Sequence, residues 1–239
     1  MPWRLSLLIV GDKVTFPSNG DTAQGYLAVP QSGSGLGVMV VQEWWGLVPQ
    51  ITGVCDKLAG EGFVALAPDL FRGEIAEHTE MDKAGQLMQT LPMDRAARDM
   101  AGAIDYLRGL PSVQNAHIGV IGFCMGGMLA LVIAAREGNK VGAVVPYYGA
   151  PLGESAPDWS NLTAPVHGHF AENDTFFSAS AVRALEADLR DMGKDVIFEV
   201  HPGTGHAFAN ETNAMGTHDE ATAGRCWATT VGFLKNKLS

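Results

Sequence analysis

Short, continuously apolar segments alternate along this chain with longer segments whose apolar residues have helical spacing. The runs 37–41 and 63–67 carry no polar side chain, which is typical of strands buried on both faces of a sheet. Between these runs, apolar residues recur at positions i, i+3, i+4 and i+7, namely Ile51, Val54, Cys55 and Leu58. This alternation predicts an α/β fold with a mostly parallel central sheet and helices on both faces.

Further elements follow from the same patterns. We expect strands at 116–121, 142–148, 166–170 and 196–201, and helices at 94–110, 128–135 and 178–192. Segments 13–16 and 25–29 predict an antiparallel hairpin. The stretch 69–90 is interpreted as a polar excursion, and the last helix is expected to start at a capping box formed by Thr217 and Glu220.

The composition favours one globular domain. A chain of 239 residues with 46% hydrophobic residues can bury a large core, and no shift in composition marks a linker, so we expect a single domain over 1–239. The net charge of −10 argues against nucleic acid or an anionic membrane as a partner, because such partners need clustered Lys and Arg. The apolar stretch 5–10 is too short to cross a membrane and is interpreted as a strand.

The cysteines and histidines suggest neither a disulfide framework nor a metal. Cys55, Cys124 and Cys226 are few and widely spaced, which favours a reducing, cytoplasmic location. His167 and His169 alternate within a strand and could suggest a metal, but no motif places a third ligand. We therefore expect no metal, no other cofactor, and a monomer or weak homodimer.

Segment 122–126, Gly-Phe-Cys-Met-Gly, has the form of a nucleophile elbow with cysteine at its centre. Because a strand precedes it and a long apolar helix follows, Cys124 is expected at a strand-to-helix turn, where the helix start directs free N–H groups at the sulfur. The pattern indicates acyl transfer by a thiol. The alternative is a buried structural thiol, since free cysteine is among the most buried residue types.

A cysteine nucleophile needs a base, because only a few per cent of a free thiol is ionised near neutral pH. In enzymes with a nucleophile elbow, the partners follow in the order acid, then histidine, on loops after later strands. Asp174 follows strand 166–170 and His206 follows strand 196–201. We predict that His206 is the general base and acid and that Asp174 orients its ring. Taken alone, Asp174 could equally be a turn residue.

Glu43 lies just after strand 37–41, where a loop can lend a backbone N–H to an oxyanion. We expect Trp44 to supply that first N–H and Met125, the residue after the nucleophile, to supply the second. A carboxylate near the thiol would raise the thiol's pKa and oppose its activation, unless the carboxyl moves away or accepts the thiol proton. The alternative for Glu43 is a solvated loop carboxylate.

Five motifs occur together, namely Gln42-Glu43-Trp44-Trp45-Gly46, Ala67-Pro68-Asp69-Leu70-Phe71, Gly122-Phe123-Cys124-Met125-Gly126-Gly127, Tyr147-Tyr148-Gly149 and Gly205-His206-Ala207-Phe208. In this order they resemble the dienelactone hydrolases, or carboxymethylenebutenolidases, which are compact α/β hydrolases with a Cys-His-Asp triad. The resemblance covers nearly the whole chain. It implies the α/β-hydrolase fold and hydrolysis of an unsaturated lactone through an acyl-enzyme on Cys124. It also implies that Glu43 pairs with the resting, neutral thiol and accepts its proton once substrate binds.

The chain departs from the family where an arginine binds the substrate carboxylate. That arginine lies four residues after the catalytic histidine in the family, and this chain has Asn210 there. Arg72 is the candidate for a second family arginine. Loss of a bidentate arginine contact weakens binding by about tenfold to a hundredfold, so we expect a related lactone or a small ester as substrate. We expect the less cationic pocket to be lined by Trp44, Trp45, Phe177 and Phe208.

Two other functions fit part of the same pattern. A thiol-dependent redox protein would use Cys124 and form a peroxide-driven disulfide with Cys55 or Cys226. A catalytically silent member of the fold would merely bind a ligand. The complete set of Cys124, Asp174 and His206 argues against a silent scaffold.

Overall fold

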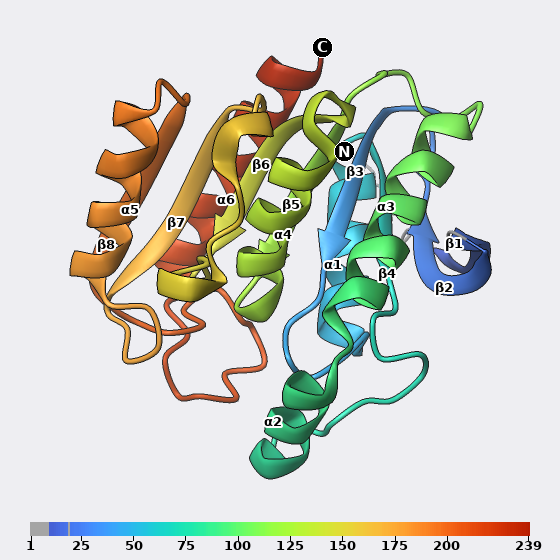
Figure 1. The fold of residues 1–239 in the computed structure, drawn as a ribbon. Helices are drawn as coiled ribbons and strands as arrows, with labels where there is room; N and C mark the ends of the chain where they lie inside the picture. Colours follow the sequence, from blue (N-terminus) through green and yellow to red (C-terminus); the bar gives the residue numbers. More distant parts are fainter. Residues whose placement is uncertain (1–9, 19) are drawn as a thin grey trace, which may run out of the picture.

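A twisted sheet of eight strands runs through the centre of the molecule (Figure 1). The computed structural model describes residues 10–18 and 20–239. The strand order is β1-β2-β4-β3-β5-β6-β7-β8. β1 pairs antiparallel with β2, and β2 pairs antiparallel with β4, whereas all pairs from β4 to β8 are parallel. The mostly parallel sheet and the hairpin predicted from the sequence are therefore confirmed.

The strands are β1 (Asp12–Ser18), β2 (Asp21–Ala28), β3 (Leu36–Val41), β4 (Phe63–Pro68), β5 (Ile118–Phe123), β6 (Val141–Tyr147), β7 (Val166–Asn173) and β8 (Val196–Gly205). The α-helices are α1 (Pro49–Gly60), α2 (Met81–Thr90), α3 (Met93–Gly109), α4 (Met125–Glu137), α5 (Ala179–Asp191) and α6 (Glu220–Leu238). Short 3-10 helices are η1 (Gly138–Lys140), η2 (Gly153–Ser155) and η3 (Trp159–Asn161). Within the described residues, no helix combines the length and apolar character needed to cross a bilayer.

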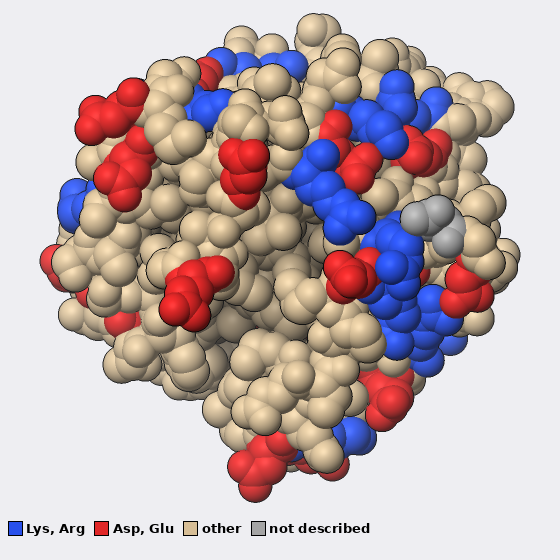
Figure 2. Space-filling model, viewed as in Figure 1, with Lys and Arg blue, Asp and Glu red and all other residues tan. Residues whose placement is uncertain are grey.

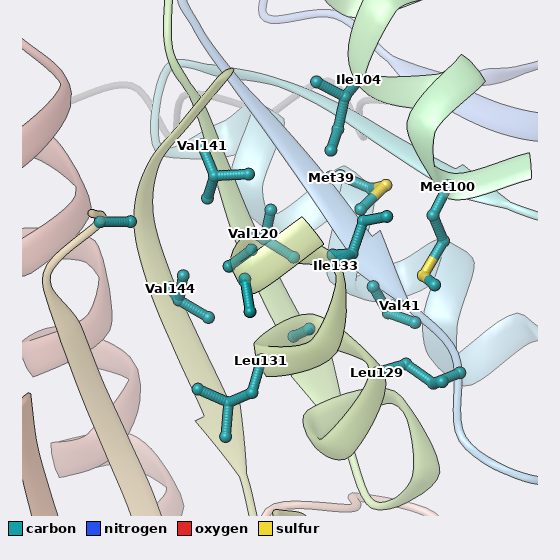
Figure 3. Packing of buried hydrophobic residues seen from close by; sticks show 14 of the residues in the cluster. Met39, Val41, Met100, Ile104, Val120, Leu129, Leu131, Ile133, Val141 and Val144 are labelled. Carbon is teal, nitrogen blue, oxygen red and sulfur yellow. The ribbon is translucent and has the colours of Figure 1, made fainter. Parts of the chain in front are cut away.

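Helices cover both faces of the sheet, with α3, α4 and α5 on one face and α1 and α6 on the other (Figure 1). Successive strand residues point to opposite faces, so Met39 and Val41 pack toward α3 and α4 (Figure 3), whereas Val38 and Val40 belong to the cluster under α1 and α6. These four side chains are fully buried. A strand apolar at every position is thus explained by helices on both sides.

Two local predictions were wrong, and one lies outside the described residues. The stretch 69–90 contains α2, whose only buried residue is Ala84, so its polar surface hid a helical pattern. The final helix begins at Glu220 and is capped by Asp219, which accepts the Thr222 N–H at 2.7 Å. The strand expected at 5–10 falls outside the described residues except for Val10, which is not in a strand.

The carboxyl ends of the parallel strands meet at one edge of the sheet, the lower edge in Figure 1. β5 ends at Phe123, β7 at Asn173 and β8 at Gly205. β7 and β8 are both longer than predicted. The residue after each of these three strands is a predicted catalytic residue, so parallel pairing brings all three side chains to the same edge.

Candidate active site

Cys124 occupies a sharp turn between β5 and α4. Its φ of 53° and ψ of −118° are unusual for a residue with a side chain. A Cβ at Gly122 would lie 2.0 Å from the carbonyl oxygen of Gly126, and a Cβ at Gly126 would lie 2.3 Å from that of Val41. Only glycine fits at both positions. The predicted strand-to-helix elbow is therefore present, and it projects the sulfur at the start of α4.

Cys124, His206 and Asp174 are hydrogen-bonded in series. The Cys124 Sγ is 3.2 Å from His206 Nε2, and His206 Nδ1 is 2.8 Å from Asp174 Oδ2. The other carboxylate oxygen, Oδ1, accepts the backbone N–H groups of Phe176 at 2.8 Å and Phe177 at 3.0 Å. Because this carboxylate can only accept, His206 donates through Nδ1 and its Nε2 lone pair faces the thiol.

Glu43 is buried rather than solvated, with 1% of its surface exposed. The Tyr148 hydroxyl donates to its Oε1 at 3.2 Å, and the Asn210 amide donates to its Oε2 at 2.8 Å. Among the described residues no hydrogen bond joins Glu43 to Cys124, whose thiol faces His206 instead. This arrangement differs from the pairing of glutamate with the resting thiol that the family resemblance implies.

Burial and charge together hold the thiol in its neutral form. Burial raises the pKa of Cys124 well above its usual range, and the negative charge of Glu43 raises it further, while the Met125 backbone N–H acts in the opposite direction. Burial also raises the pKa of the Glu43 carboxyl, which nearby His206 and the bonds from Tyr148 and Asn210 partly offset. Ionising the thiol therefore requires transfer of its proton to a neighbouring base.

The two predicted oxyanion donors have the required freedom. Met125 is the first residue of α4, and its N–H faces the Cys124 sulfur. Trp44 lies in the loop after β3, and no acceptor within the described part of the chain receives its backbone N–H. Backbone N–H groups at such positions can donate hydrogen bonds to a substrate oxygen.

The predicted substrate contacts are divided between the surface and the interior. Trp45 and Phe208 are 1% and 0% exposed, so neither lines an open pocket as predicted. Trp45 packs against Trp44 and Phe208 packs against Tyr148 instead. Phe177 is half-buried and stacks on His206 with its ring centroid 5.9 Å away. Asn210 is buried and engages Glu43. Arg72 pairs with Asp21 at 2.8 Å and with Asp99 at 3.6 Å, so its charge is already compensated.

Sequence reasoning missed Phe176 as a residue of the site and missed the role of Tyr148, although Tyr148 lies in one of the family motifs. Phe176 is 53% exposed, and its ring centroid lies 4.8 Å from that of His206 and 6.5 Å from that of Trp44. Tyr148 holds Glu43, and its ring lies 5.3 Å from that of His206. The position of Phe176 two residues after Asp174 was an available signal. The role of Tyr148 depends on a contact 105 residues away in the sequence, which no local pattern reveals.

The face of the molecule seen in Figure 2 is hollowed close to where the lower end of α4 lies in Figure 1, and the floor of the hollow carries neither Lys or Arg nor Asp or Glu. A separate cavity of about 800 Å³ lies beside α1 and α6, with Lys57, Phe123 and Trp227 in its wall. None of the three triad residues lines that cavity.

Residues 23–238 match the model of the dienelactone hydrolase family. Among curated relatives, Protein usf of Aquifex pyrophilus is 35% identical over 96% of this chain and 100% of its own length. A putative carboxymethylenebutenolidase of Aquifex aeolicus is 34% identical, again over 96% of this chain and 100% of its own length.

Solved structures show the same fold. A putative dienelactone hydrolase of Klebsiella pneumoniae superimposes with a TM-score of 0.82 at 25% identity, covering 95% of this chain and 98% of that one. A dienelactone hydrolase-like promiscuous phosphotriesterase from metagenomic libraries shares the fold, with a TM-score of 0.84 at 22% identity over 97% of this chain and 100% of that one. From the extent of the family match and of the full-length relatives, the chain belongs to the dienelactone hydrolase family.

Proposed function

We propose that the protein hydrolyses a lactone or a small carboxylic ester through an acyl-enzyme on Cys124. The observation that carries this proposal is the hydrogen-bonded series of Cys124, His206 and Asp174, at 3.2 and 2.8 Å, on the carboxyl edge of the sheet. Relatives named as carboxymethylenebutenolidases support the same class of reaction.

In the first step, the Cys124 sulfur attacks the substrate carbonyl while its proton passes to His206 Nε2. Asp174 stabilises the imidazolium through Nδ1. The negative charge that develops on the carbonyl oxygen is stabilised by the N–H groups of Trp44 and Met125. The bond between the carbonyl carbon and the ring or alkoxy oxygen of the substrate then breaks, and that leaving oxygen takes the proton from His206.

In the second step, water hydrolyses the thioester. His206 accepts a proton from the water as the water oxygen bonds to the carbonyl carbon. The carbon–sulfur bond breaks, and the departing sulfur recovers its proton. The net reaction adds one water to the substrate, gives a free acid and restores the neutral thiol.

Glu43 keeps the resting thiol neutral in this scheme. Its charge lies close enough to Cys124 to raise the thiol pKa, and reactivity toward oxidants follows thiolate character. Tyr148 and Asn210 fix Glu43 through its two oxygens.

The surroundings favour an uncharged substrate. Arg72 is paired with Asp21, Asn210 is engaged with Glu43, and the hollow has an uncharged floor (Figure 2). Phe176 and Phe177 pack against His206, and Trp44 packs against Phe176, so the three rings provide apolar contact area. A small neutral lactone or ester fits these surroundings better than a lactone that bears a carboxylate.

Initial hydrolysis rates test the proposal. We would compare the unmodified protein, Cys124→Ala and Cys55→Ala on cis- and trans-dienelactone, an uncharged lactone and p-nitrophenyl acetate. Cys55 is a buried thiol in α1, so Cys55→Ala controls for loss of any thiol. We expect kcat to fall at least about a thousandfold in Cys124→Ala only, and the uncharged substrates to have the higher kcat/KM. An active Cys124→Ala would refute the mechanism.

The cytoplasmic location and the monomeric or weakly dimeric state stay predictions.

A further inference from the structure

Three side chains that commonly bind metals converge on the face of the sheet covered by α6. They come from three elements: His169 from β7, His201 from β8 and Cys226 from α6. His169 Nδ1 is 3.2 Å from His201 Nε2, which is 3.2 Å from the Cys226 sulfur. All three donor atoms lie within 4.8 Å of one another. None of these residues belongs to the proposed catalytic triad.

A carboxylate stands next to the three donors. Glu199 Oε2 is 4.0 Å from both His169 Nδ1 and His201 Nε2. Tetrahedral zinc, with bonds of about 2.0–2.3 Å, holds its ligand atoms about 3.3–3.6 Å apart. His201 Nε2 already lies at nearly this separation from both His169 Nδ1 and the Cys226 sulfur, at 3.2 Å each. Glu199 has a 44% exposed side chain, so it is free to turn toward the three donors and complete a four-ligand set.

Neighbouring groups orient two of these ligands. The Thr230 hydroxyl lies 3.3 Å from His169 Nε2 and 2.7 Å from the Tyr147 hydroxyl. When His169 donates to Thr230 through Nε2, its Nδ1 lone pair points to the centre of the cluster. His167 Nε2 lies 2.8 Å from the other oxygen of Glu199. Outer partners of this kind are typical of metal sites, where they fix the tautomer and orientation of each ligand.

We propose that His169, His201, Cys226 and Glu199 form a structural zinc site. Two imidazoles with one thiolate and one carboxylate suit zinc, whereas magnesium and calcium prefer oxygen ligands. Four protein ligands leave no open position for substrate, so the metal stabilises structure. On binding, the Cys226 thiol releases its proton to solvent.

The position of the site gives it a consequence for the catalytic edge. His169 lies five residues before Asp174 on β7, and His201 lies five residues before His206 on β8. A metal bridging these strands and α6 would fix the relative register of the strands a few residues before Asp174 and His206. The zinc site does not depend on the proposed hydrolase function, and its test does not use hydrolysis.

Zinc-dependent stability provides the first test. The background is Cys124→Ala, which removes the only other thiol that hydrogen-bonds to a histidine among the described residues. After treatment with chelator, we expect zinc chloride to raise Tm progressively with concentration, because a ligand that binds only the folded state stabilises it. We expect the rise to persist with Cys55→Ala, a matched buried thiol, and to disappear with Cys226→Ala or His201→Gln. A Tm unaffected by zinc, or a rise that survives both ligand variants, would overturn the proposal.

Cobalt(II) provides a test that does not rely on Tm. We expect one equivalent to produce a thiolate-to-cobalt charge-transfer band and the intense visible bands of four-coordinate cobalt, both absent in Cys226→Ala. Thr230→Val keeps every ligand, and we expect it to weaken zinc affinity by about tenfold to a hundredfold. Weak, six-coordinate cobalt spectra that are the same in all variants would show that the cluster is only a hydrogen-bonded chain.

Discussion

At the scale of single residues, Asp174 shows how position and chemistry combine. One of its oxygens is saturated by two backbone N–H groups, and the other receives His206 Nδ1–H. Asp174→Asn keeps the shape, but its amide N–H₂ cannot accept that proton and favours the wrong tautomer of His206. We expect kcat to fall by about 10³–10⁴, with little change in KM. Steady-state kinetics on p-nitrophenyl acetate measure this, and a variant with more than a tenth of the normal kcat would exclude the orienting role.

The charge of Glu43 is expected to slow the reaction of the Cys124 thiol with alkylating reagents. Because Glu43 raises the pKa of Cys124, Glu43→Gln should lower that pKa and speed alkylation of Cys124 by iodoacetamide at neutral pH. The pH at which alkylation is half-maximal should also fall. Glu211→Gln is the control, since Glu211 is an exposed neighbour of Asn210. Equal alkylation profiles for Glu43→Gln and the unmodified protein would remove Glu43 from the account of the resting state.

Glu43 also makes stability depend on pH. Burial raises its folded-state pKa above the unfolded value of about 4.3, so the folded state binds the carboxyl proton more tightly than the unfolded state does. This stabilisation is fully present below the unfolded pKa and is lost as pH rises through the folded pKa. A neutral Gln accepts from Asn210 without that penalty. We therefore expect Glu43→Gln to have a higher Tm than the unmodified protein. This difference should grow as the pH rises from about 4 toward neutrality. A Tm difference independent of pH would contradict the buried charge.

At the scale of elements, the elbow requires α4 to start close against β3. A Cβ at Gly126 would lie 2.3 Å from the Val41 oxygen and 2.5 Å from the Gln42 oxygen, so Gly126→Ala must push apart the helix and the loop that carries Glu43 and Trp44. We expect a loss of about 1–3 kcal/mol in the free energy of unfolding, measured by urea denaturation. Gly53→Ala in α1 meets no atom within 4 Å and should instead stabilise the protein by about 0.5–1 kcal/mol. Equal effects of the two substitutions would show that the close approach is not a constraint.

The elements that the sequence predicts well are those whose hydrophobic pattern is strong. The buried strands and the helices α1, α3, α4 and α5 can be recognised in the sequence because either one face or the whole segment is apolar. α2 was missed because it buries only Ala84. The start of α6 was misplaced because Thr217 and Asp219 are both good N-caps, and the Thr217 hydroxyl instead donates to the backbone carbonyl of His206.

The same distinction applies to the site. Cys124, Asp174 and His206 follow strands directly, so the topology of a parallel sheet predicts their meeting. The partners of Glu43 and the cluster of His169, His201 and Cys226 depend on side chains brought together from separate elements. Their contacts span 25 to 167 residues of sequence, and periodicity within one element carries no information about them.

At the scale of the whole molecule, the net charge of −10 opposes the approach of an anionic substrate. Among uncharged and anionic substrates with the same reacting group, we expect the advantage in kcat/KM of the uncharged one to shrink as ionic strength rises, because salt screens long-range repulsion. Paired kinetics in low and high salt measure this. Preference for the anionic lactone at low salt would mean that a cationic group of the protein binds the carboxylate.

Detection of an acyl group on Cys124 tests the central mechanism most directly. The protein would be mixed with p-nitrophenyl acetate, quenched in acid within the first turnovers, and its peptides analysed by tandem mass spectrometry. We predict an acetyl thioester on Cys124 that forms at least as fast as turnover and is absent from Cys124→Ala. Steady turnover with no acyl group on Cys124, or with acylation at another residue, would contradict the account.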